Sequence, residues 1–315
     1  MTQVNLALGT MHFGTLVDEV DSFALLDRFV DAGGTILDTA DAYAFWADPS
    51  RSGGQSESVI GRWLSGRPGL RNRVFLGTKV GIEPIADLAW PANRQGLSAP
   101  VIAKGIEGSL RRLGTDRVDL YWAHLDDRDV ELEETVGAMA GLVADGKVLR
   151  LGASNHPAWR VERARQIATR HGWEPYTALQ LSYSYLQPRP LASVDIQDHP
   201  FGMAGVESID YARSDPSLWL WAYSPLLRGS YARPDRPFGE AYDHPGTTRR
   251  LAVLGEVAEE IGATRNQIVL AWLTGGDLAI TPIVGVSGAE QLDEAIAGVS
   301  IVLTDEQRHR LDAAV

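Results

Sequence analysis

Cysteine is absent from this chain of 315 residues. Its absence excludes disulfide bonds, thiolate metal sites and a cysteine nucleophile. No apolar stretch approaches the roughly 20 residues that a membrane-spanning helix needs, so we expect no membrane span. The first residues, 1–5, lack a basic region followed by an apolar one. We therefore expect no secretory signal and a cytoplasmic protein.

Clusters of positive charge are also missing. The chain has 29 Lys and Arg against 41 Asp and Glu, a net charge of −12, and no Lys- or Arg-rich run. We therefore expect neither nucleic acid nor an anionic membrane as a partner. His, Asp and Glu do not cluster at metal-ligand spacing, and no Gly-x-Ser-x-Gly nucleophile motif occurs, so we expect no metal site.

What the sequence does contain is a repeated alternation of short β-branched apolar runs with amphipathic helical patterns. The expected strands are 5–9, 36–39, 74–79, 120–124, 148–154, 178–182, 218–224 and 280–284. The expected helices are 20–31, 56–64, 100–113, 132–145, 158–171, 206–212, 249–261 and 289–297. Continuous apolar strands between helices indicate a parallel sheet covered by helices.

Eight such units favour an α/β protein of the closed (β/α)8 TIM barrel type, with residues 1–315 as one domain. A doubly wound open sheet is the alternative, and it would place a G-x-G-x-x-G motif after the first strand. The segment from Gly9 to Gly14 does not have that pattern, so the barrel is the stronger prediction.

Local signals mark the loops and helix ends. Segments 188–217 and 229–247, which flank the seventh strand, are longer than a barrel needs, and long loops in a compact domain are often functional. Ser98 is placed to cap a helix that has Pro100 in its first turn. Thr304 is placed to open a C-terminal helix.

Three successive strands end in titratable residues. Asp38 ends the second strand and Tyr43 lies just beyond it, Lys79 ends the third, and His124 ends the fourth. In a barrel, catalytic residues lie at the C-terminal ends of the strands. Each residue alone also fits a structural role, as a cap, a surface charge or a core histidine. The prediction of a site therefore depends on their joint placement.

These four residue types suit acid–base chemistry at a carbonyl group. A tyrosine has an ordinary pKa of about 10 and is a poor acid near neutral pH. A nearby ammonium favours the phenolate, so we expect Lys79 to lower the pKa of Tyr43. Asp38 would hold the ammonium, and His124 would orient the carbonyl oxygen or share its proton. The set predicts general-acid reduction of a carbonyl, with Tyr43 as the proton donor.

The sequence resembles the aldo-keto reductase superfamily from Leu8 to about Ala297. The resemblance lies in LDTADAY at 37–43, GQSE at 54–57 with Ile60 and Gly61, TK at 78–79, and DLY at 119–121 leading to His124. It implies reversible, NAD(P)H-dependent reduction of an aldehyde or ketone. It also implies a catalytic tetrad of Asp38, Tyr43, Lys79 and His124, with Tyr43 as acid or base.

The same resemblance implies a set of cofactor contacts at the strand ends. Ser154, Asn155 and Gln180 match the residues that bind the nicotinamide carboxamide, and Tyr223 matches the residue that stacks on the ring. The full expected set is Gly9, Thr10, Met11, Asp38, Ser154, Asn155, Gln180, Tyr223, Ser224, Leu226, Arg228, Gly285, Ser287 and Gln291.

The turn after the last strand, VGVSGAEQ at 284–291, combines glycines with a helix start and so suits a phosphate group. Relatives that bind the 2′-phosphorylated cofactor usually place Lys or Arg at or near Gly285, Ser287 and Gln291, and often Asn at the position of Ala295. This chain has none of these residues there. NADP(H) remains the expected cofactor of the family, and NAD(H) stays open.

The expected substrate is a small carbonyl compound or alcohol, and its pocket is predicted by position alone. The candidates are His12 after the first strand, Trp46 beyond Tyr43, Trp90 in the third loop and Leu125 after His124. The two tryptophans equally fit loop packing; as pocket residues they would suit an apolar or sugar-ring substrate.

Two other functions are compatible with this sequence. One is a nucleotide-binding regulatory subunit that senses redox state and turns over slowly, since an intact tetrad does not exclude it. The other is a (β/α)8 hydrolase or isomerase, because a fold does not fix a function. The absence of a carboxylate pair or metal cluster from the strand ends argues against the second.

Overall fold

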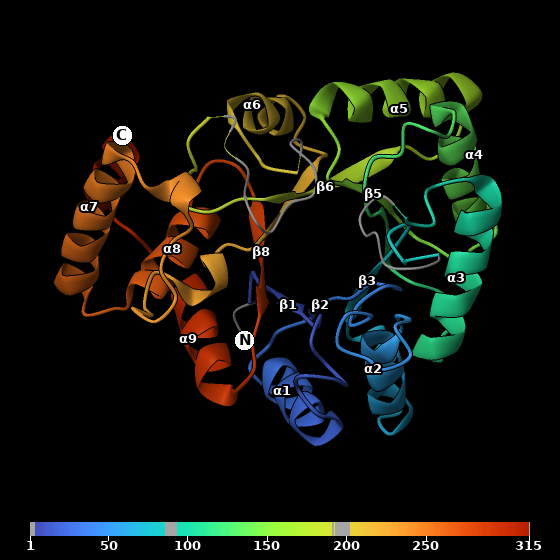
Figure 1. Ribbon diagram of the computed structural model, residues 1–315, viewed down its shortest axis with the longest axis horizontal. Helices are drawn as coiled ribbons and strands as arrows, with labels where there is room; N and C mark the ends of the chain where they lie inside the picture. The colour runs from blue at the N-terminus through green and yellow to red at the C-terminus, as the bar shows by residue number, and fades with distance from the viewer. Residues whose placement is uncertain (1–3, 86–92, 191, 193–201, 315) are drawn as a thin grey trace.

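The computed structural model describes residues 4–85, 93–190, 192 and 202–314. Eight parallel strands follow one another in chain order around a closed barrel (Figure 1). This confirms the (β/α)8 prediction, and the open-sheet alternative is wrong. The strands are β1 (Ala7–Gly9), β2 (Ile36–Asp38), β3 (Phe75–Val80), β4 (Leu120–Ala123), β5 (Leu151–Ser154), β6 (Tyr176–Ser182), β7 (Trp219–Tyr223) and β8 (Ile280–Gly285).

Helices surround the strands on the outside of the barrel (Figure 1). Among the described residues none of them is both long and apolar enough to cross a membrane. The α-helices are α1 (Glu19–Asp31), α2 (Gln55–Ser65), α3 (Ala99–Leu113), α4 (Leu132–Ala144), α5 (Ala158–His171), α6 (Val206–Ser214), α7 (Pro245–Ile261), α8 (Arg265–Thr274), α9 (Ala289–Val299) and α10 (Asp305–Ala313). Short 3-10 helices are η1 (Leu70–Asn72), η2 (Leu227–Gly229) and η3 (Glu240–Tyr242).

Helix α8 has no counterpart in the sequence prediction. It packs against α7, α9 and β8, and buried residues lie on several of its sides, so it has no single apolar face. Its one local signal is a capping box in which Thr264 and Gln267 bond reciprocally. The segment 229–247 is also partly ordered helix, because η3 lies within it and α7 begins at Pro245.

The two predicted helix caps have different outcomes. Thr304 caps α10 with its side chain and forms a capping box with Gln307, as expected for this position. Ser98 occupies the N-cap position of α3 and Pro100 lies in the first turn, as predicted, but the Ser98 side chain makes no cap hydrogen bond. The neighbouring helix supplies the acceptor, because Ala99 N donates to Glu134 Oε1 at 2.9 Å.

Alternate residues of each strand face the barrel interior and the helices. Leu120 and Trp122 of β4 belong to one apolar cluster, together with Ile36 and Trp221, whereas Tyr121 belongs to the larger cluster under the helices. The first cluster therefore fills the barrel interior. Asp38 lies two positions beyond Ile36 and so points into the same interior, toward the C-terminal ends of the strands.

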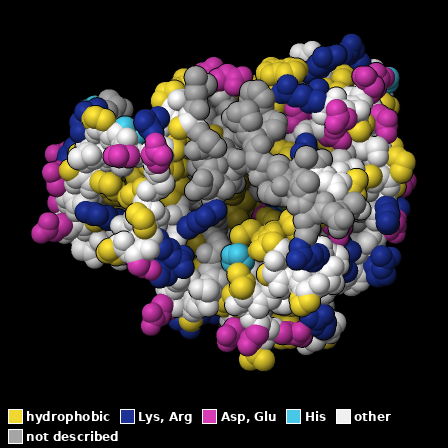
Figure 2. Space-filling model, viewed as in Figure 1, with side chains coloured by type: hydrophobic (Ala, Val, Ile, Leu, Met, Phe, Trp, Pro, Cys, Tyr) yellow, Lys and Arg dark blue, Asp and Glu magenta, His cyan; other side chains and the backbone are white. Residues whose placement is uncertain are grey.

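Figure 2 shows a hollow near the centre of the molecular surface, where hydrophobic side chains and a histidine are exposed.

Candidate active site

All four residues of the predicted tetrad lie together at the C-terminal ends of neighbouring strands. Asp38 is the last residue of β2, Lys79 is next to last in β3, and His124 follows directly after β4. Tyr43 lies in the turn that leaves β2, and its hydroxyl reaches Lys79. The closed parallel sheet brings the four together because it aligns the ends of consecutive strands.

Lys79 is the centre of this cluster. Its Nζ donates to Asp38 Oδ2 at 2.6 Å, to Tyr43 Oη at 2.7 Å and to the backbone oxygen of Thr39 at 2.8 Å. The side chains of Lys79 and Asp38 are 0% and 1% exposed. An ammonium group has three N–H donors, so these contacts account for all of them and fix its position.

The ionisation of Tyr43 differs from the sequence expectation. Burial raises the pKa of Tyr43 well above its ordinary value, and the Asp38 carboxylate, 3.4 Å away, raises this pKa further. The expectation that Lys79 brings this pKa down is therefore wrong as a net effect. Asp38 already balances the ammonium charge, and a buried phenolate loses its hydration. Tyr43 consequently carries its proton at neutral pH.

Burial also shifts the pKa of Lys79 and of His124. It lowers the pKa of Lys79, and the carboxylates of Asp38, Asp41 and Glu57 act in the opposite direction. It lowers the pKa of His124 well below the ordinary value, and the positive charge of Lys79 lowers it further. His124 is therefore neutral near pH 7, with one ring nitrogen as donor and the other as acceptor.

The His124 ring lies edge-on to the Tyr43 ring, with the centroids 5.9 Å apart. Within the part of the chain that the structure describes, His124 Nδ1 has no hydrogen-bond partner. His124 is 8% exposed, so this ring nitrogen is enclosed. A neutral imidazole in this place can orient a polar atom of a bound molecule.

Asp38 has a further partner on the opposite side of the barrel. Gln180 Nε2 of β6 donates to Asp38 Oδ1 at 3.0 Å, and both side chains are buried. Sequence analysis assigned Gln180 to cofactor binding and gave it no link to the tetrad. Only the closed barrel, which joins residues 142 positions apart, makes this contact.

Three hydroxyl groups support the backbone around Asp38. Ser56 Oγ at the start of α2 lies 2.7 Å from Thr10 Oγ1 and 2.8 Å from Thr39 Oγ1. Thr10 Oγ1 donates to the backbone oxygen of Asp38 at 2.9 Å. Sequence analysis noted Ser56 only as part of a motif; its position on the apolar face of its helix was the available signal.

Buried acidic groups lie behind Lys79. Glu57 of α2 accepts from Thr78 Oγ1 at 2.5 Å and from Arg112 Nε at 2.7 Å. Burial raises the pKa of Asp41 well above its ordinary value, and the charges of Glu57 and Glu83 raise it further. Among the described residues Asp41 Oδ1 has no hydrogen-bond partner. These acids offset part of the cost of burying the Lys79 ammonium.

Polar groups that could hold a carboxamide continue around the ring of strand ends. Asn155 follows β5, and its Nδ2 donates to His124 O at 3.0 Å and to Ser154 Oγ at 3.1 Å. Tyr223 Oη, at the end of β7, donates to Asn155 Oδ1 at 2.8 Å. Ser154 and Gln180 occupy paired positions in β5 and β6. The tetrad thus forms one continuous network with Ser154, Asn155, Gln180 and Tyr223.

The backbone after β5 and β7 is strained. Asn155, Ser224, Leu227 and Arg228 have φ values of 56°, 53°, 46° and 59°, in the left-handed region that favours glycine. Such conformations cost roughly 1–3 kcal/mol each and cluster at functional sites. Leu226 and the exposed Arg228 lie in this loop, and Arg228 lies within η2.

The remaining expected cofactor residues lie at the ends of β1 and β8. Gly9 ends β1 and is followed by the buried Thr10 and the exposed Met11. Gly285 ends β8 beside Gly9. Ser287 N and Ser287 Oγ both donate to Gln291 Oε1, at 2.8 and 3.2 Å. The amide oxygen of Gln291 therefore accepts from both the backbone N–H and the hydroxyl of Ser287 in this turn.

This set of groups matches the requirements of a nicotinamide nucleotide. A carboxamide needs both donors and acceptors, which the hydroxyl and amides of Ser154, Asn155 and Gln180 provide. An aromatic ring, Tyr223, stands at the next strand end. A phosphate can bind at a helix N-terminus, and the N-cap of α9 is Gly288, which has no side chain that could occupy the first N–H groups of the helix.

The expected substrate residues lie at different depths. His12 is partly buried, Leu125 is 5% exposed, and Trp46 is 48% exposed with its ring edge-on to Phe45. Burial lowers the pKa of His12 below its ordinary value. Trp90 lies outside the described residues.

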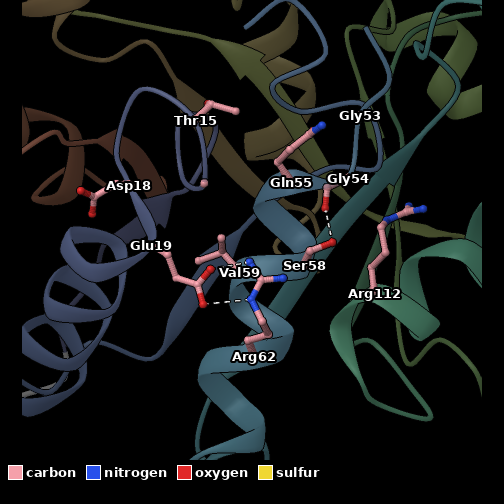
Figure 3. Close-up of a pocket in the computed structure, with 11 residues that line it drawn as sticks. Thr15, Asp18, Glu19, Gly53, Gly54, Gln55, Ser58, Val59, Arg62 and Arg112 are labelled. Atoms are coloured by element: carbon pink, nitrogen blue, oxygen red, sulfur yellow. Dashed lines mark hydrogen bonds and ion pairs between the residues drawn. The ribbon is translucent and has the colours of Figure 1, made fainter. Parts of the chain in front are cut away.

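A cavity of about 350 Å³ lies outside this network (Figure 3). It is a groove bordered by α1, α2 and Arg112, and the ion pair of Arg62 with Glu19, 2.7 Å long, crosses it. None of the predicted catalytic or binding residues lines it. The groove is therefore distinct from the candidate active site.

Comparison with known proteins agrees with this geometry. Residues 5–315 match the family model described as the Aldo/keto reductase family. An uncharacterized oxidoreductase of Bacillus subtilis, YrpG, is 31% identical over an alignment that covers 96% of this chain and 89% of that protein.

Two fungal relatives are similar at the same level. The norsolorinic acid reductase stcV of Emericella nidulans is 31% identical, over 98% of this chain and 78% of its own. The aldo-keto reductase str7 of Strobilurus tenacellus is 33% identical, over 94% and 81%. The resemblance noted in the sequence is thereby confirmed: the chain belongs to the aldo/keto reductase family of nicotinamide-dependent oxidoreductases.

Proposed function

We propose that this protein reduces the carbonyl group of a small aldehyde or ketone to an alcohol, reversibly, with Tyr43 as the proton donor. The observation that carries the proposal is the 2.7 Å hydrogen bond between Lys79 Nζ and Tyr43 Oη inside a barrel of this family. A protonated phenol beside a fixed cation is suited to donate a proton and to stabilise the phenolate that remains.

Each residue of the tetrad has one task in this reaction. When bound, a nicotinamide cofactor would supply the hydride for the carbonyl carbon. Tyr43 Oη releases its proton to the carbonyl oxygen, and the Lys79 ammonium balances the resulting phenolate. Asp38 holds Lys79 in place through the 2.6 Å contact. The neutral ring of His124 orients the carbonyl oxygen next to the Tyr43 hydroxyl.

The cofactor is held by the residues at the other strand ends. In this proposal Ser154, Asn155 and Gln180 bind the carboxamide, and Tyr223 packs on the ring. We take NADP(H), the usual cofactor of the family, as the first candidate. NAD(H) is the alternative, because residues 285–291 contain no Lys or Arg and Gln291 engages the donors of Ser287.

The substrate binds between the tetrad and the rim formed by His12, Trp46 and Leu125. The large exposed area of the Trp46 indole favours a substrate with an apolar or ring-shaped body. Two of the relatives are named norsolorinic acid reductase and versiconal hemiacetal acetate reductase, which is consistent with a carbonyl-bearing substrate.

The test is a tryptophan-fluorescence titration with NADPH and, separately, with NADH, followed by a panel of aldehydes and ketones with the cofactor that binds. The nine Trp residues of the chain provide the signal. We expect saturable quenching and oxidation of the cofactor that depends on the carbonyl compound. Absence of binding by both cofactors would refute the proposal. Binding without turnover over a broad panel would favour the regulatory alternative instead.

A further inference from the structure

A hydrogen bond crosses the interior of the barrel. It runs from Gln180 Nε2 in β6 to Asp38 Oδ1 in β2, over 3.0 Å. Three strands separate β2 from β6 in either direction around the closed ring, so the two residues extend from opposite walls. Gln180 is 2% exposed and Asp38 is 1% exposed. The contact is therefore shielded from solvent and joins two parts of the site.

The two oxygens of Asp38 have different partners. Oδ2 accepts from Lys79 Nζ at 2.6 Å and lies 3.4 Å from Tyr43 Oη, whereas Oδ1 accepts from Gln180. We propose that Gln180 is a positioning residue for proton transfer, which fixes the Asp38 carboxylate so that Lys79 stays directed at the Tyr43 hydroxyl. This role rests on the proposed carbonyl reduction and adds to the binding of the carboxamide.

The physical reason is the freedom of an unheld carboxylate. Without Gln180, Oδ1 becomes a buried charged acceptor with no partner, which is costly. The carboxylate is then free to rotate about the Cβ–Cγ bond, and this rotation can shorten the 3.4 Å contact between Asp38 Oδ2 and the Tyr43 hydroxyl. That contact retains the phenol proton at the moment when the reaction requires its release. Loss of Gln180 therefore slows proton transfer even with the cofactor fully bound.

Two variants separate this role from cofactor binding. Gln180→Met keeps the length of the side chain and removes its amide. Gln180→Glu keeps an acceptor for the carboxamide, removes the amide donor and places a second carboxyl group against Asp38. At saturating cofactor we expect kcat to fall about tenfold or more in both variants, the loss of a hydrogen bond to a charged group. We also expect a larger solvent isotope effect on the single-turnover rate.

Three control results distinguish a loss of the positioning role from weaker cofactor binding and from a wrong proposed function. Gln166→Met, the same substitution on the exposed surface of α5, should leave kcat and the solvent isotope effect unchanged. A weaker cofactor Kd in the fluorescence titration, with kcat unchanged at saturation in both variants, would show that Gln180 only holds the cofactor and would overturn the role. No turnover and no cofactor binding in the parent protein would overturn the proposed function, and this role with it.

A further measurement needs neither cofactor nor turnover. Thermal unfolding of the ligand-free parent, Gln180→Met, Asp38→Asn and the double variant forms a double-mutant cycle. We expect the loss of Tm in the double variant to be clearly smaller than the sum of the two single losses. Additive losses would contradict the contact itself and thereby the role.

Discussion

The ammonium group of Lys79 lies over the ring of Tyr43, 4.4 Å from its centroid, and donates to its hydroxyl at 2.7 Å. The same ammonium is bound by Asp38 on its other side. Tyr43 therefore faces a cation whose charge is already partly balanced. The phenol is protonated in the resting protein. When the proton leaves, the Lys79 ammonium is already in position to stabilise the phenolate.

Tyr43→Phe tests the proton donor directly. The change removes only the hydroxyl, so we expect kcat for carbonyl reduction to fall by about 10²–10⁴-fold, the usual contribution of a general acid. Cofactor binding should remain close to that of the parent protein, because the expected cofactor contacts come from other residues. Steady-state kinetics and the fluorescence titration measure the two quantities. Turnover like that of the parent would exclude Tyr43 as the donor.

Lys79→Met leaves the buried Asp38 carboxylate without its cation. Removing one partner of a buried ion pair costs about 3–5 kcal/mol, so we expect a large loss of Tm together with the loss of activity. Adding Asp38→Asn removes the uncompensated charge and should restore much of the stability but none of the activity. Thermal unfolding and kinetics of the single and double variants test both parts; recovery of activity in the double variant would contradict the role of Lys79.

The raised pKa of Tyr43 predicts an alkaline limit. The reduction rate should not depend on this group at neutral pH and should fall only above its ordinary pKa of 10.0. The native state keeps this proton where the unfolded chain loses it. The contribution to stability is therefore complete below pH 10.0 and is lost as pH rises toward the native pKa. Unfolding free energies of the parent and of Tyr43→Phe above that pH should show a shallower decline in the variant.

Asp41 should reduce stability at neutral pH. Its pKa is raised by burial and by the charges of Glu57 and Glu83. The stabilising contribution of such a carboxyl is complete below the ordinary value of 3.8 and is lost as pH rises through the native pKa. Asp41→Asn should therefore raise Tm at pH 7 and have little effect at low pH. Asp116→Asn, whose side chain is 88% exposed, is the control and should change Tm little at either pH.

Gln291→Arg should change the cofactor preference. In the parent protein the amide oxygen of Gln291 accepts from Ser287 N and Oγ at the turn before α9. An arginine at this position frees those donors and adds a cation that can pair with the 2′-phosphate. We expect the ratio of NADH Kd to NADPH Kd to rise by about tenfold, corresponding to about 1.4 kcal/mol. An unchanged ratio in the titrations would place the 2′-phosphate away from this turn.

Sequence patterns were sufficient to predict those strands and helices whose apolar residues recur at a regular spacing. The alternation of apolar runs and helical patterns predicted eight strands, and each lies within a few residues of its expected position. Helix α8 escaped detection because it is buried on several sides and so has no amphipathic period. Ser98 holds the expected N-cap position but makes no cap hydrogen bond; Pro100, the second residue of the helix, has no N–H to offer, and Glu134 of another helix accepts from Ala99 N.

The sequence by itself determined which residues stand at the strand ends, since a parallel barrel places Asp38, Lys79 and His124 on one face whatever the details of packing. Only the tertiary structure decided how they interact. The pKa of Tyr43 is raised because the folded chain excludes water from the phenol and places the charge of Asp38 next to it. The bond from Gln180 to Asp38 depends on closure of the barrel, which brings opposite walls within 3.0 Å. Neither distance nor desolvation is encoded in the spacing of residues along the chain.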